Sequence, residues 1–412
     1  MKTKYFKIIF SLLLLLFPGL FSGGILTAKN YRLHDLVELL KQNSLLLEIA
    51  TIDNKIAKED YRAARALPNP EIEMFKGEAE VPGEPGRPAI WGVGGKISIP
   101  NPLYRFYFLK SLRKHISEAE IEAEIKKNNI IKDLKTHYFH LQFARKIAVL
   151  LQKKIARLTE VNRITKAKAT IGEAKEIDYL RTSVEIQKNK SRLFRMEKIV
   201  SHQRIKINEF LNFSLEGDYS MAADFSYMPL AGIEESLDEL IERCPLIVLK
   251  ANELEKKKAG LKASRFSILE AVELFGERGQ EVDAKTWKVG IGISLPIFNT
   301  HAAQIRKAKY ERRKAQKEFE HAGKHLFADI DRMVSEIRVL EKEIDTFTGA
   351  VLKEGRKNIE LTEKLYKEGE ISLVVFLDSQ NSFFEIEQRY YEAITEWKIL
   401  KAELDELLGE EI

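Results

Sequence analysis

Residues 91–100 read Trp-Gly-Val-Gly-Gly-Lys-Ile-Ser-Ile-Pro, and residues 287–296 repeat that pattern as Trp-Lys-Val-Gly-Ile-Gly-Ile-Ser-Leu-Pro, 196 positions further on. A Gly-Glu pair at 172–173 returns at 369–370, at an offset of 197. Chance is a poor explanation when two separated blocks keep nearly the same offset. The sequence therefore predicts two units of about 200 residues that share one order of parts.

Both ten-residue stretches alternate between two kinds of side chain. The odd positions of 91–99 carry Trp, Val, Gly, Ile and Ile, whereas the even positions carry Gly, Gly, Lys and Ser. The odd positions of 287–295 carry Trp, Val, Ile, Ile and Leu. Because successive side chains of a strand point to opposite faces, each stretch predicts a strand with one apolar face and one small or polar face. Two amphipathic hairpins on a soluble core are the alternative, but little else in the chain resembles a globular core.

Each predicted strand has a partner upstream, so that each unit contains a hairpin. The links within these hairpins, at 81–88 and 276–285, are rich in Pro, Gly or charged residues. Such composition is typical of turns and loops. The four strands are expected at about 70–78, 89–100, 268–277 and 286–296.

The segments between the hairpins are predicted to be unusually long helices. Residues 103–169 contain neither Pro nor Gly, and residues 300–366 contain no Pro. At 1.5 Å per residue, about 65 residues make a rod on the order of 100 Å long. Apolar residues recur every seven positions from Phe376 to Leu404, which is a coiled-coil pattern. Each unit is thus interpreted as helix, strand, strand, long helix, turn and helix.

The first 28 residues have the composition of a secretory signal peptide. Lys2, Lys4 and Lys7 precede an apolar run at 8–20, and small residues follow at 22–28. A retained membrane anchor is the alternative, but the apolar run is short for a span. The chain is therefore divided into a signal peptide at 1–28, a first repeat at 29–212, a linker at 213–235 and a second repeat at 236–412.

Composition and motifs argue against several classes of function. Lys and Arg number 67 against 62 Asp and Glu, a near balance that disfavours a dedicated nucleic-acid binder. The single cysteine, Cys244, excludes an internal disulfide and a Cys-cluster metal site. Neither a Gly-x-x-x-x-Gly-Lys-Ser/Thr loop nor a Gly-x-Ser-x-Gly elbow is present, so we expect no catalytic residues, no cofactor and no enzyme activity.

Two histidine pairs have spacings that let both rings touch one ligand. His137 and His140 are three positions apart, and His321 and His325 are four apart. Structural and catalytic zinc sites use at least three protein ligands, and no third ligand clusters with either pair. Both pairs are therefore interpreted as packing or surface residues, and no metal site is expected.

Four membrane-compatible strands cannot close a barrel within one chain, because single-chain barrels need at least about eight. An open sheet edge is also not tolerated in lipid. The strands must then be pooled between copies, so that two copies give eight and three give twelve. The helices are far longer than a membrane is thick and must project into water. The pooled strands would form a pore, and the projecting helices would assemble into a tube that continues from it. Such a structure implies that the protein conducts a solute.

Residues 366–380, Tyr-Lys-Glu-Gly-Glu-Ile-Ser-Leu-Val-Val-Phe-Leu-Asp-Ser-Gln, resemble the Tyr-x-x-Gly-x-x-Ser turn and Leu-Asp-Ala-Gln segment of TolC-type outer-membrane efflux proteins. That resemblance covers roughly 31–410. The first repeat keeps Gly-Glu at 172–173 but has Lys175 where Ser is usual. Leu-Pro-Asn-Pro at 67–70 is similar to the heavy-metal efflux branch, whereas Asn-Pro-Leu-Tyr-Arg at 101–105 departs from its usual Gly-Lys-Arg-like group.

The resemblance implies an α+β membrane protein that serves as the exit duct of a tripartite export system. Its internal two-fold repeat of long coiled-coil helical hairpins and four β-strands would contribute to a trimeric 12-stranded β-barrel with an α-helical periplasmic tunnel. The implied partners are two further copies, outer-membrane lipid, a periplasmic adaptor (membrane fusion) protein and an inner-membrane pump of RND or ABC type, with no nucleic acid. Localisation would be the outer membrane, with helices in the periplasm.

The cargo stays open at this point. Small molecules or metal ions compete with proteins, as in the outer-membrane component of type I protein secretion. A secreted coiled-coil structural protein is the alternative from another class. Trp91 and Trp287 are expected to face lipid near an interface, because aromatic residues favour that depth.

The helical tip is the expected gate. Gly172 and Gly369 permit the chain to reverse between long helices. Asp178 and Asp378 enter the returning helices, where an acid near the helix start is also favoured by the dipole alone. In the family, the positions matching Tyr366 and Asp378 constrict the entrance, and a second acid often stands where this chain has Val375. The predicted periplasmic gate and tip residues are Tyr366, Asp378, Asp178, Gly172 and Gly369.

Overall fold

The computed structural model describes residues 29–80, 82–83, 86–173, 175–215, 219–221, 225–230, 237–269 and 271–409. The expected signal peptide at 1–28 lies outside the described residues, as does much of the expected linker at 213–235. Among the helices within these ranges, none combines the length and the apolar character that a membrane span requires.

The two halves of the chain fold into the same series of elements. The first half contains α2 (Leu33–Asn43), α3 (Leu45–Arg65), β2 (Glu71–Glu78), β3 (Ala89–Pro100), α4 (Pro102–Thr170) and α5 (Glu176–Phe210). The second contains α6 (Leu237–Arg243), α7 (Pro245–Phe266), β5 (Ala271–Glu281), β6 (Ala284–Ile293), α8 (Ala302–Thr346), the π-helix η1 (Phe347–Val351), α9 (Leu352–Glu368) and α10 (Leu373–Leu408). The predicted order of helix, strand, strand, long helix, turn and helix is present in both.

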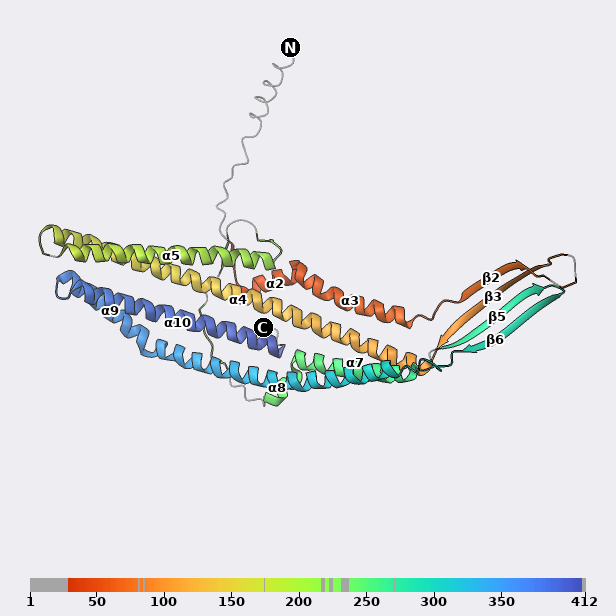
Figure 1. Cartoon of the computed structure of the whole chain (residues 1–412). Coiled ribbons are helices and arrows are strands. Elements are labelled where there is room, and N and C mark those ends of the chain that lie inside the picture. The colour runs from red at the N-terminus through yellow and green to blue at the C-terminus, as the bar shows by residue number, and fades with distance from the viewer. Residues whose placement is uncertain are drawn as a thin grey trace, which may run out of the picture.

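The molecule is a long, gently curved rod (Figure 1). The four strands β2, β3, β5 and β6 extend from one end, and the turns α4–α5 and α9–α10 lie together at the other (Figure 1). Near the middle, β1 (Lys29–Tyr31) pairs in parallel with β4 (Tyr219–Met221). This short pair ties the start of the described chain to the segment that follows α5.

The helices form one curved layer rather than a closed bundle. In the half next to the strands, α4 packs against α3 and α7, and α7 packs against α8. In the half next to the turns, α4 packs against α5 and α10, and α10 packs against α8 and α9. First-repeat helices α3 and α5 therefore form one edge of the layer, and second-repeat helices α8 and α9 form the other.

The predicted heptad seam of α10 lies in the core. Phe376 and Leu404 are almost fully buried, and Trp397 and Ala393 between them are also buried. Residues from α7, α8 and α10 form one apolar cluster around Ile330, Ile337 and Ile344, whose exposed fraction is zero. The seven-residue spacing therefore marks a helix that packs along most of its length against its neighbours.

The four-stranded sheet is antiparallel in the order β2-β3-β5-β6. Strand β3 of the first hairpin pairs with β5 of the second, with Trp91 opposite Gln280 and Ile97 opposite Leu274. Strands β2 and β6 are consequently the edges of the sheet. Among the residues that the structure describes, no further strand pairs with the outer row of backbone groups on either edge.

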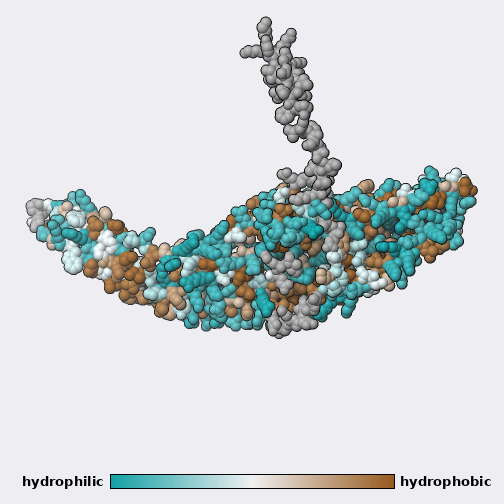
Figure 2. All heavy atoms as spheres, turned by 180° about the vertical axis from the view of Figure 1, so that it is seen from behind, coloured by the Kyte–Doolittle hydropathy of each residue, from teal (hydrophilic) through white to brown (hydrophobic). Residues whose placement is uncertain are grey.

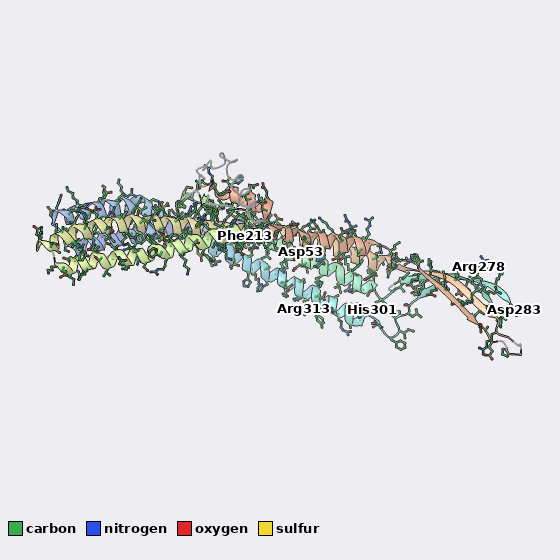
Figure 3. The ribbon with its side chains drawn as sticks, turned by 90° about the horizontal axis from the view of Figure 1, so that it is seen from above. Asp53, Phe213, Arg278, Asp283, His301 and Arg313 are labelled. Carbon is green, nitrogen blue, oxygen red and sulfur yellow. The ribbon has the colours of Figure 1, made fainter. Side chains whose placement is uncertain are left out.

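The predicted link at 276–285 was wrong. Strand β5 continues to Glu281, β6 begins at Ala284, and only Val282 and Asp283 connect them. The charged residues taken for a loop belong to the ladder: Glu277 lies opposite Lys288, whose Nζ is 3.0 Å from Glu281 Oε1. Figure 3 places Asp283 at the far end of this hairpin.

The π-helix explains why the two offsets differ by one residue. Up to the end of α8, core positions of α4 and α8 match at an offset of 196. The buried pairs are Ala119 and Ala315, Leu134 and Ile330, Tyr138 and Val334, Leu141 and Ile337, Ala144 and Leu340, and Ala148 and Ile344. Helix α4 is continuous over 69 residues, whereas its counterpart is interrupted by η1 at Phe347–Val351. A π-turn accommodates one extra residue in a helix, which accounts for the offset of 197 at the tip.

Candidate functional site

One face of the sheet is apolar and exposed. Met74 lies opposite Val93, and Leu274 lies opposite both Ile97 and Ile291, so side chains from all four strands share this face. The exposed members are Ile72, Met74, Trp91, Val93, Ile99, Leu274, Trp287, Val289, Ile291 and Ile293. Hydrophobic side chains gather toward the strand-bearing end in Figure 2. An apolar surface of this extent marks an interaction with lipid or with another protein.

The two tryptophans of this apolar face have charged neighbours. Lys76 lies opposite Trp91, and Arg278 lies opposite Trp287. Aromatic rings beside long cationic side chains are typical of the depth at which a membrane meets water. The pairing supports the expected interfacial position of Trp91 and Trp287, which stays a prediction.

The other face of the sheet is polar and mainly acidic. Lys96 Nζ lies 2.9 Å from Glu71 Oε2 and 3.0 Å from Glu73 Oε1. By the strand pairing, Glu273, Glu277 and Glu281 share that face. Carboxylates thus outnumber the ammonium groups of Lys96 and Lys288, so the face suits water and cations.

Glycines on the polar face make room for phenylalanine rings. A Cβ atom on Gly92 would lie 2.4 Å from Phe75 Cε1, and one on Gly290 would lie 2.3 Å from Phe275 Cζ. Each ring covers the bare backbone of the glycine opposite it, which protects that part of the sheet. These glycines are therefore required by ring packing, in addition to keeping the face small.

Two glycines form the turns at the opposite end of the rod. Gly172 has φ 81° and Gly369 has φ 85°, both in the left-handed region that glycine adopts without strain. Ser372 then caps α10, because its Oγ accepts a hydrogen bond from the Val375 N–H. Lys175 stands at the corresponding N-cap of α5 and makes no side-chain cap there. The departure of Lys175 from the family pattern thus costs the first returning helix a capping bond.

Tyr366 joins the two helical hairpins. Its ring is 7% exposed and stacks on Phe376 with centroids 5.5 Å apart. Its hydroxyl shares a hydrogen bond with the fully buried Thr165 hydroxyl of α4. Burial raises the pKa of Tyr366, and the negative charge of Asp178 raises it further. The phenol therefore stays protonated and keeps this bond at physiological pH.

Three further contacts join the same hairpins and were not foreseen from the sequence. Arg157 Nε lies 2.9 Å from Glu363 Oε2, and Lys168 Nζ donates to the Lys367 carbonyl at 3.4 Å. Deeper in the rod, Lys154 Nζ donates to Asn381 Oδ1 at 2.7 Å. The sequence did contain a signal for Lys154. This lysine falls between Leu151 and Leu158 in the apolar spacing of α4, at a position that faces inward.

The two predicted aspartates occupy different surroundings. Asp178 is half-buried near Tyr366. Asp378 is exposed and lines an open groove between α9 and α10 with Asn358 and Ser382. The structure therefore brings Tyr366 and Asp178 together and places Asp378 in a separate groove of the same tip.

Lys154 gives the protein a specific dependence on pH. Burial lowers the pKa of Lys154 to about 8, and its ammonium lies 4.7 Å from the Phe384 ring centroid. The unfolded lysine keeps a pKa near 10.4, so between about pH 8 and 10 the unfolded state binds more protons than the folded state. Stability should therefore rise with pH in that window. Below it both states bind the proton, so the penalty of burying the charged Lys154 is constant and adds no pH dependence.

Thermal unfolding of the detergent-solubilised protein at pH 7.5, 8.5 and 9.5 tests this expectation. As the pH rises, the midpoint temperature of unfolding of the unaltered protein should increase relative to that of Lys154→Met. Parallel pH curves for the two proteins would contradict it. The variant loses the bond to Asn381 equally at every pH, so that loss alone shifts the curve without changing its slope.

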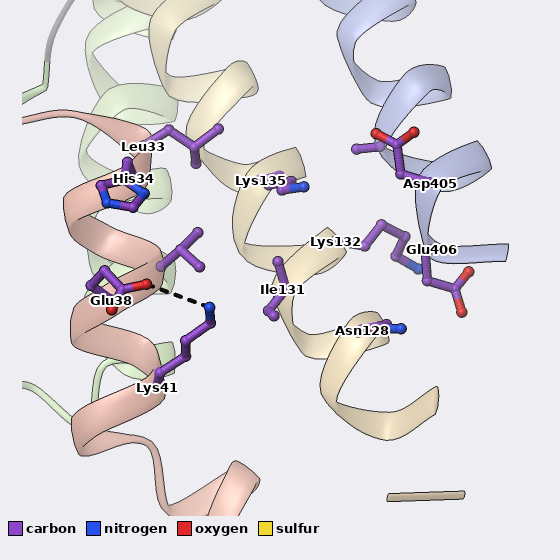
Figure 4. Close-up of a pocket in the computed structure, with 12 residues that line it drawn as sticks. Leu33, His34, Glu38, Lys41, Asn128, Ile131, Lys132, Lys135, Asp405 and Glu406 are labelled. Carbon is purple, nitrogen blue, oxygen red and sulfur yellow. Dashed lines mark ion pairs between the residues drawn. The ribbon is translucent and has the colours of Figure 1, made fainter. Parts of the chain in front are cut away.

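A cavity between α2, α4 and α10 is a further candidate (Figure 4). Glu38 and Lys41 form an ion pair of 3.4 Å at its wall, and burial lowers the pKa of Lys135. The lining mixes Lys132 and Lys135 with Asp405 and Glu406. Charges of both signs in similar number favour no single class of ligand.

The histidine pairs differ in the structure. His137 Nδ1 is 2.7 Å from Gln203 Oε1, and burial lowers the pKa of His140. His321 and His325 are exposed on α8. In the part of the chain that the structure describes, three or more His, Cys, Asp or Glu side chains nowhere gather as a metal site.

Comparisons with known proteins agree with this architecture. A membrane protein from Pseudomonas aeruginosa superposes with a TM-score of 0.79 at 16% identity, over 93% of this chain and 91% of that one. CusC gives 0.79 at 14% identity over 93% of both chains, and the Campylobacter jejuni CmeC outer membrane channel gives 0.79 at 16% identity over 92% of this chain and 85% of that one. The chain therefore shares the fold of these solved proteins.

The sequence comparisons match parts of the chain. Residues 261–410 match the outer membrane efflux protein family. The cobalt-zinc-cadmium resistance protein CzcC of Cupriavidus metallidurans is 23% identical over 184 residues, which is 44% of this chain and 44% of that relative. The alignment thus spans less than half of the relative's length. With the fold, these matches confirm the resemblance to TolC-type outer-membrane efflux proteins.

Proposed function

We propose that this protein is the outer-membrane channel of a tripartite efflux system, which passively conducts small molecules or metal ions from the periplasm to the outside. The observation that carries the proposal is an open sheet with one exposed apolar face and one acidic face, continuous with helices that reach on the order of 100 Å. The apolar face meets lipid and the acidic face lines water. Energy comes from an inner-membrane pump of RND or ABC type, reached through a periplasmic adaptor protein.

The assembly follows from the two open edges of the sheet. In lipid, the unpaired backbone groups of β2 and β6 need partners. A second copy supplies them when its β2 pairs with β6, and a ring of three copies closes a barrel of twelve strands. The homotrimer stands in the outer membrane, with its helices in the periplasm.

The repeat fixes the expected register of this pairing between copies. Trp287 is the counterpart of Trp91. Lys76 faces Trp91 as Arg278 faces Trp287, so Lys76 and Arg278 are also counterparts. Two positions further along each strand, Gln280 is therefore the counterpart of Glu78. Inside the chain, Trp91 lies opposite Gln280. The same relation applied between copies puts Trp287 opposite Glu78 and Ile291 opposite Met74.

The helical edges support the same arrangement. Inside the chain α7 packs on α4, and their counterparts α3 and α8 lie on opposite edges of the layer. Helix α3 carries an exposed apolar stripe formed by Leu45, Ile49, Ile52 and Ile56. That stripe would be covered by α8 of the next copy, as the equivalent face of α7 is covered by α4.

Cysteine cross-linking tests the register. Met74→Cys with Ile291→Cys should join copies into covalent dimers and trimers on a denaturing gel, because paired residues lie within the distance that a disulfide bridges. The natural Cys244 is fully buried and adds little background. Glu78→Cys with Ile291→Cys is the matched control, four positions out of register and on the order of 13 Å apart. Preferential cross-linking of the control would show that the register is wrong.

The conduction itself is tested separately. The purified protein should form channels in planar bilayers and migrate as a heat-modifiable trimer. A monomer without channel activity would favour the secreted coiled-coil structural protein.

The cargo is tested by deleting the gene and scoring sensitivity to metals, dyes and detergents. Cobalt, zinc and cadmium come first because of the relative CzcC. Loss of a secreted protein without such sensitivity would favour type I protein secretion.

The gate belongs to the same proposal. The turns at Gly172 and Gly369 meet the adaptor, and Tyr366, with Asp178 nearby, holds the two hairpins together through its bond to Thr165. Asp378, once per copy, adds an acid to the entrance of the trimer. What supports this is the buried bond between Tyr366 and Thr165 at the end of the rod opposite the strands.

A further inference from the structure

Two imidazole rings lie against each other on the exposed side of α8. His321 and His325 are one helical turn apart, and their ring centroids are 4.0 Å apart with an interplanar angle of 27°. Both side chains are exposed, whereas the next residue, Leu326, is 3% exposed and belongs to the core cluster. The pair therefore faces away from the core of its own chain.

This geometry points to a metal chelate. A bound Zn²⁺ lies about 2.0–2.1 Å from an imidazole nitrogen, so two such ligands need nitrogens roughly 3 Å apart. Two histidines four positions apart on one helix face supply that arrangement in known zinc motifs. The stacked rings, with centroids 4.0 Å apart, are close enough to reach this arrangement by side-chain rotation.

We infer that His321 and His325 form a two-ligand site for a late first-row divalent cation such as Ni²⁺, Cu²⁺ or Zn²⁺, with water in the remaining positions. Imidazole suits these metals, whereas Ca²⁺ and Mg²⁺ take oxygen ligands. The inference does not depend on the proposed function, because the site lies within one chain and can be loaded whether or not the protein conducts.

The acidic residues just before His321 are paired with lysines, which leaves the imidazoles as the ligands on that side. Glu318, one turn before His321, lies 3.7 Å from Lys314, and Glu320, directly before His321, lies 2.6 Å from Lys317, so lysines compensate both acids. With only two protein ligands, the cation exchanges with solvent rather than being held as a structural ion. Such a site suits a cargo or a sensed ion.

The repeat shows that helix packing does not require this pair. At the offset of 196 that holds along α8, the counterparts of His321 and His325 on α4 are Ile125 and Asn129. His325→Asn therefore installs a residue that the equivalent helix already carries. The fold should tolerate it, and circular dichroism would verify this.

The test uses the full-length protein in detergent, titrated with Ni²⁺ by calorimetry and with Cu²⁺ by electron paramagnetic resonance. The Cu²⁺ spectrum should show two nitrogen ligands for the first equivalent per chain. Even the loss of an outer-shell partner of a metal ligand costs about 10–100-fold in affinity. His325→Asn and His321→Ala should each weaken Ni²⁺ binding at least about tenfold, and the double variant little more, because either loss destroys the chelate.

His202→Asn is the matched control. His202 is exposed on α5, and lysines occupy the positions four residues before and after it, so it has no helical histidine partner. Its replacement should leave Ni²⁺ affinity unchanged. The inference is overturned if His325→Asn binds Ni²⁺ as tightly as the unaltered protein, or if the first Cu²⁺ equivalent shows a single nitrogen ligand.

Discussion

Val289→Arg is expected to prevent assembly of the protein in the outer membrane. Val289 is 74% exposed on the apolar face of β6 and lies opposite Gly276 in the middle of the hairpin. An arginine on the lipid face of a barrel costs about 2–4 kcal/mol at the bilayer midplane, and the proposed trimer would carry three. Because the change affects every copy, the heat-modifiable trimer and the channel activity should both be lost.

The control is the adjacent residue on the opposite face. Lys288 lies on the polar side, where its ammonium pairs with Glu281. Lys288→Arg keeps the charge and should leave assembly intact. Membrane fractionation and gel mobility with and without heating give the readout. If Val289→Arg assembled as well as Lys288→Arg, the exposed apolar face would not be a lipid face, and the proposed barrel would fail.

The strands could be predicted because their pattern is local. Trp91 and Trp287 open two alternating runs, and strand periodicity needs no knowledge of the rest of the fold. The extension of β5 to Glu281 could not be foreseen, because a run of charged residues has the composition of a loop. Only the partner strand shows that Arg278 lies opposite Trp287 and continues the ladder.

The tip was harder to predict, because its contacts depend on which helices become neighbours. The turn glycines followed from the repeat, since each stands between two long helices. Thr165 did not, because a threonine in a helix is uninformative until the helix beside it is known. The offset between the two repeats changes from 196 to 197 because the second repeat contains one extra residue. Only the structure shows that the π-helix at Phe347–Val351 accommodates it.

Tyr366→Phe is expected to shift the channel toward an open state. The substitution keeps the ring that stacks on Phe376 and removes only the hydroxyl that bonds Thr165. Thr165 still donates to the Val161 carbonyl at 2.8 Å, so no buried donor is left without a partner. A hydrogen bond contributes about 0.5–1.5 kcal/mol. Three copies that open together would lose about 1.5–4.5 kcal/mol, which changes the closed-to-open ratio roughly tenfold to a thousandfold.

Thr165→Val provides an independent way to remove the same bond. Its conductance in planar bilayers should rise as much as that of Tyr366→Phe, and the double variant should add little, because both changes remove one interaction. Asp378→Ala, added to Tyr366→Phe, should in addition lower the preference for cations, since a ring of three acids in the trimer attracts them. If Tyr366→Phe and Thr165→Val both conducted like the unaltered protein, the buried bond would be only a packing contact between hairpins. Asp378 would then be interpreted as a solvated acid near the start of α10 if its removal also left ion selectivity unchanged.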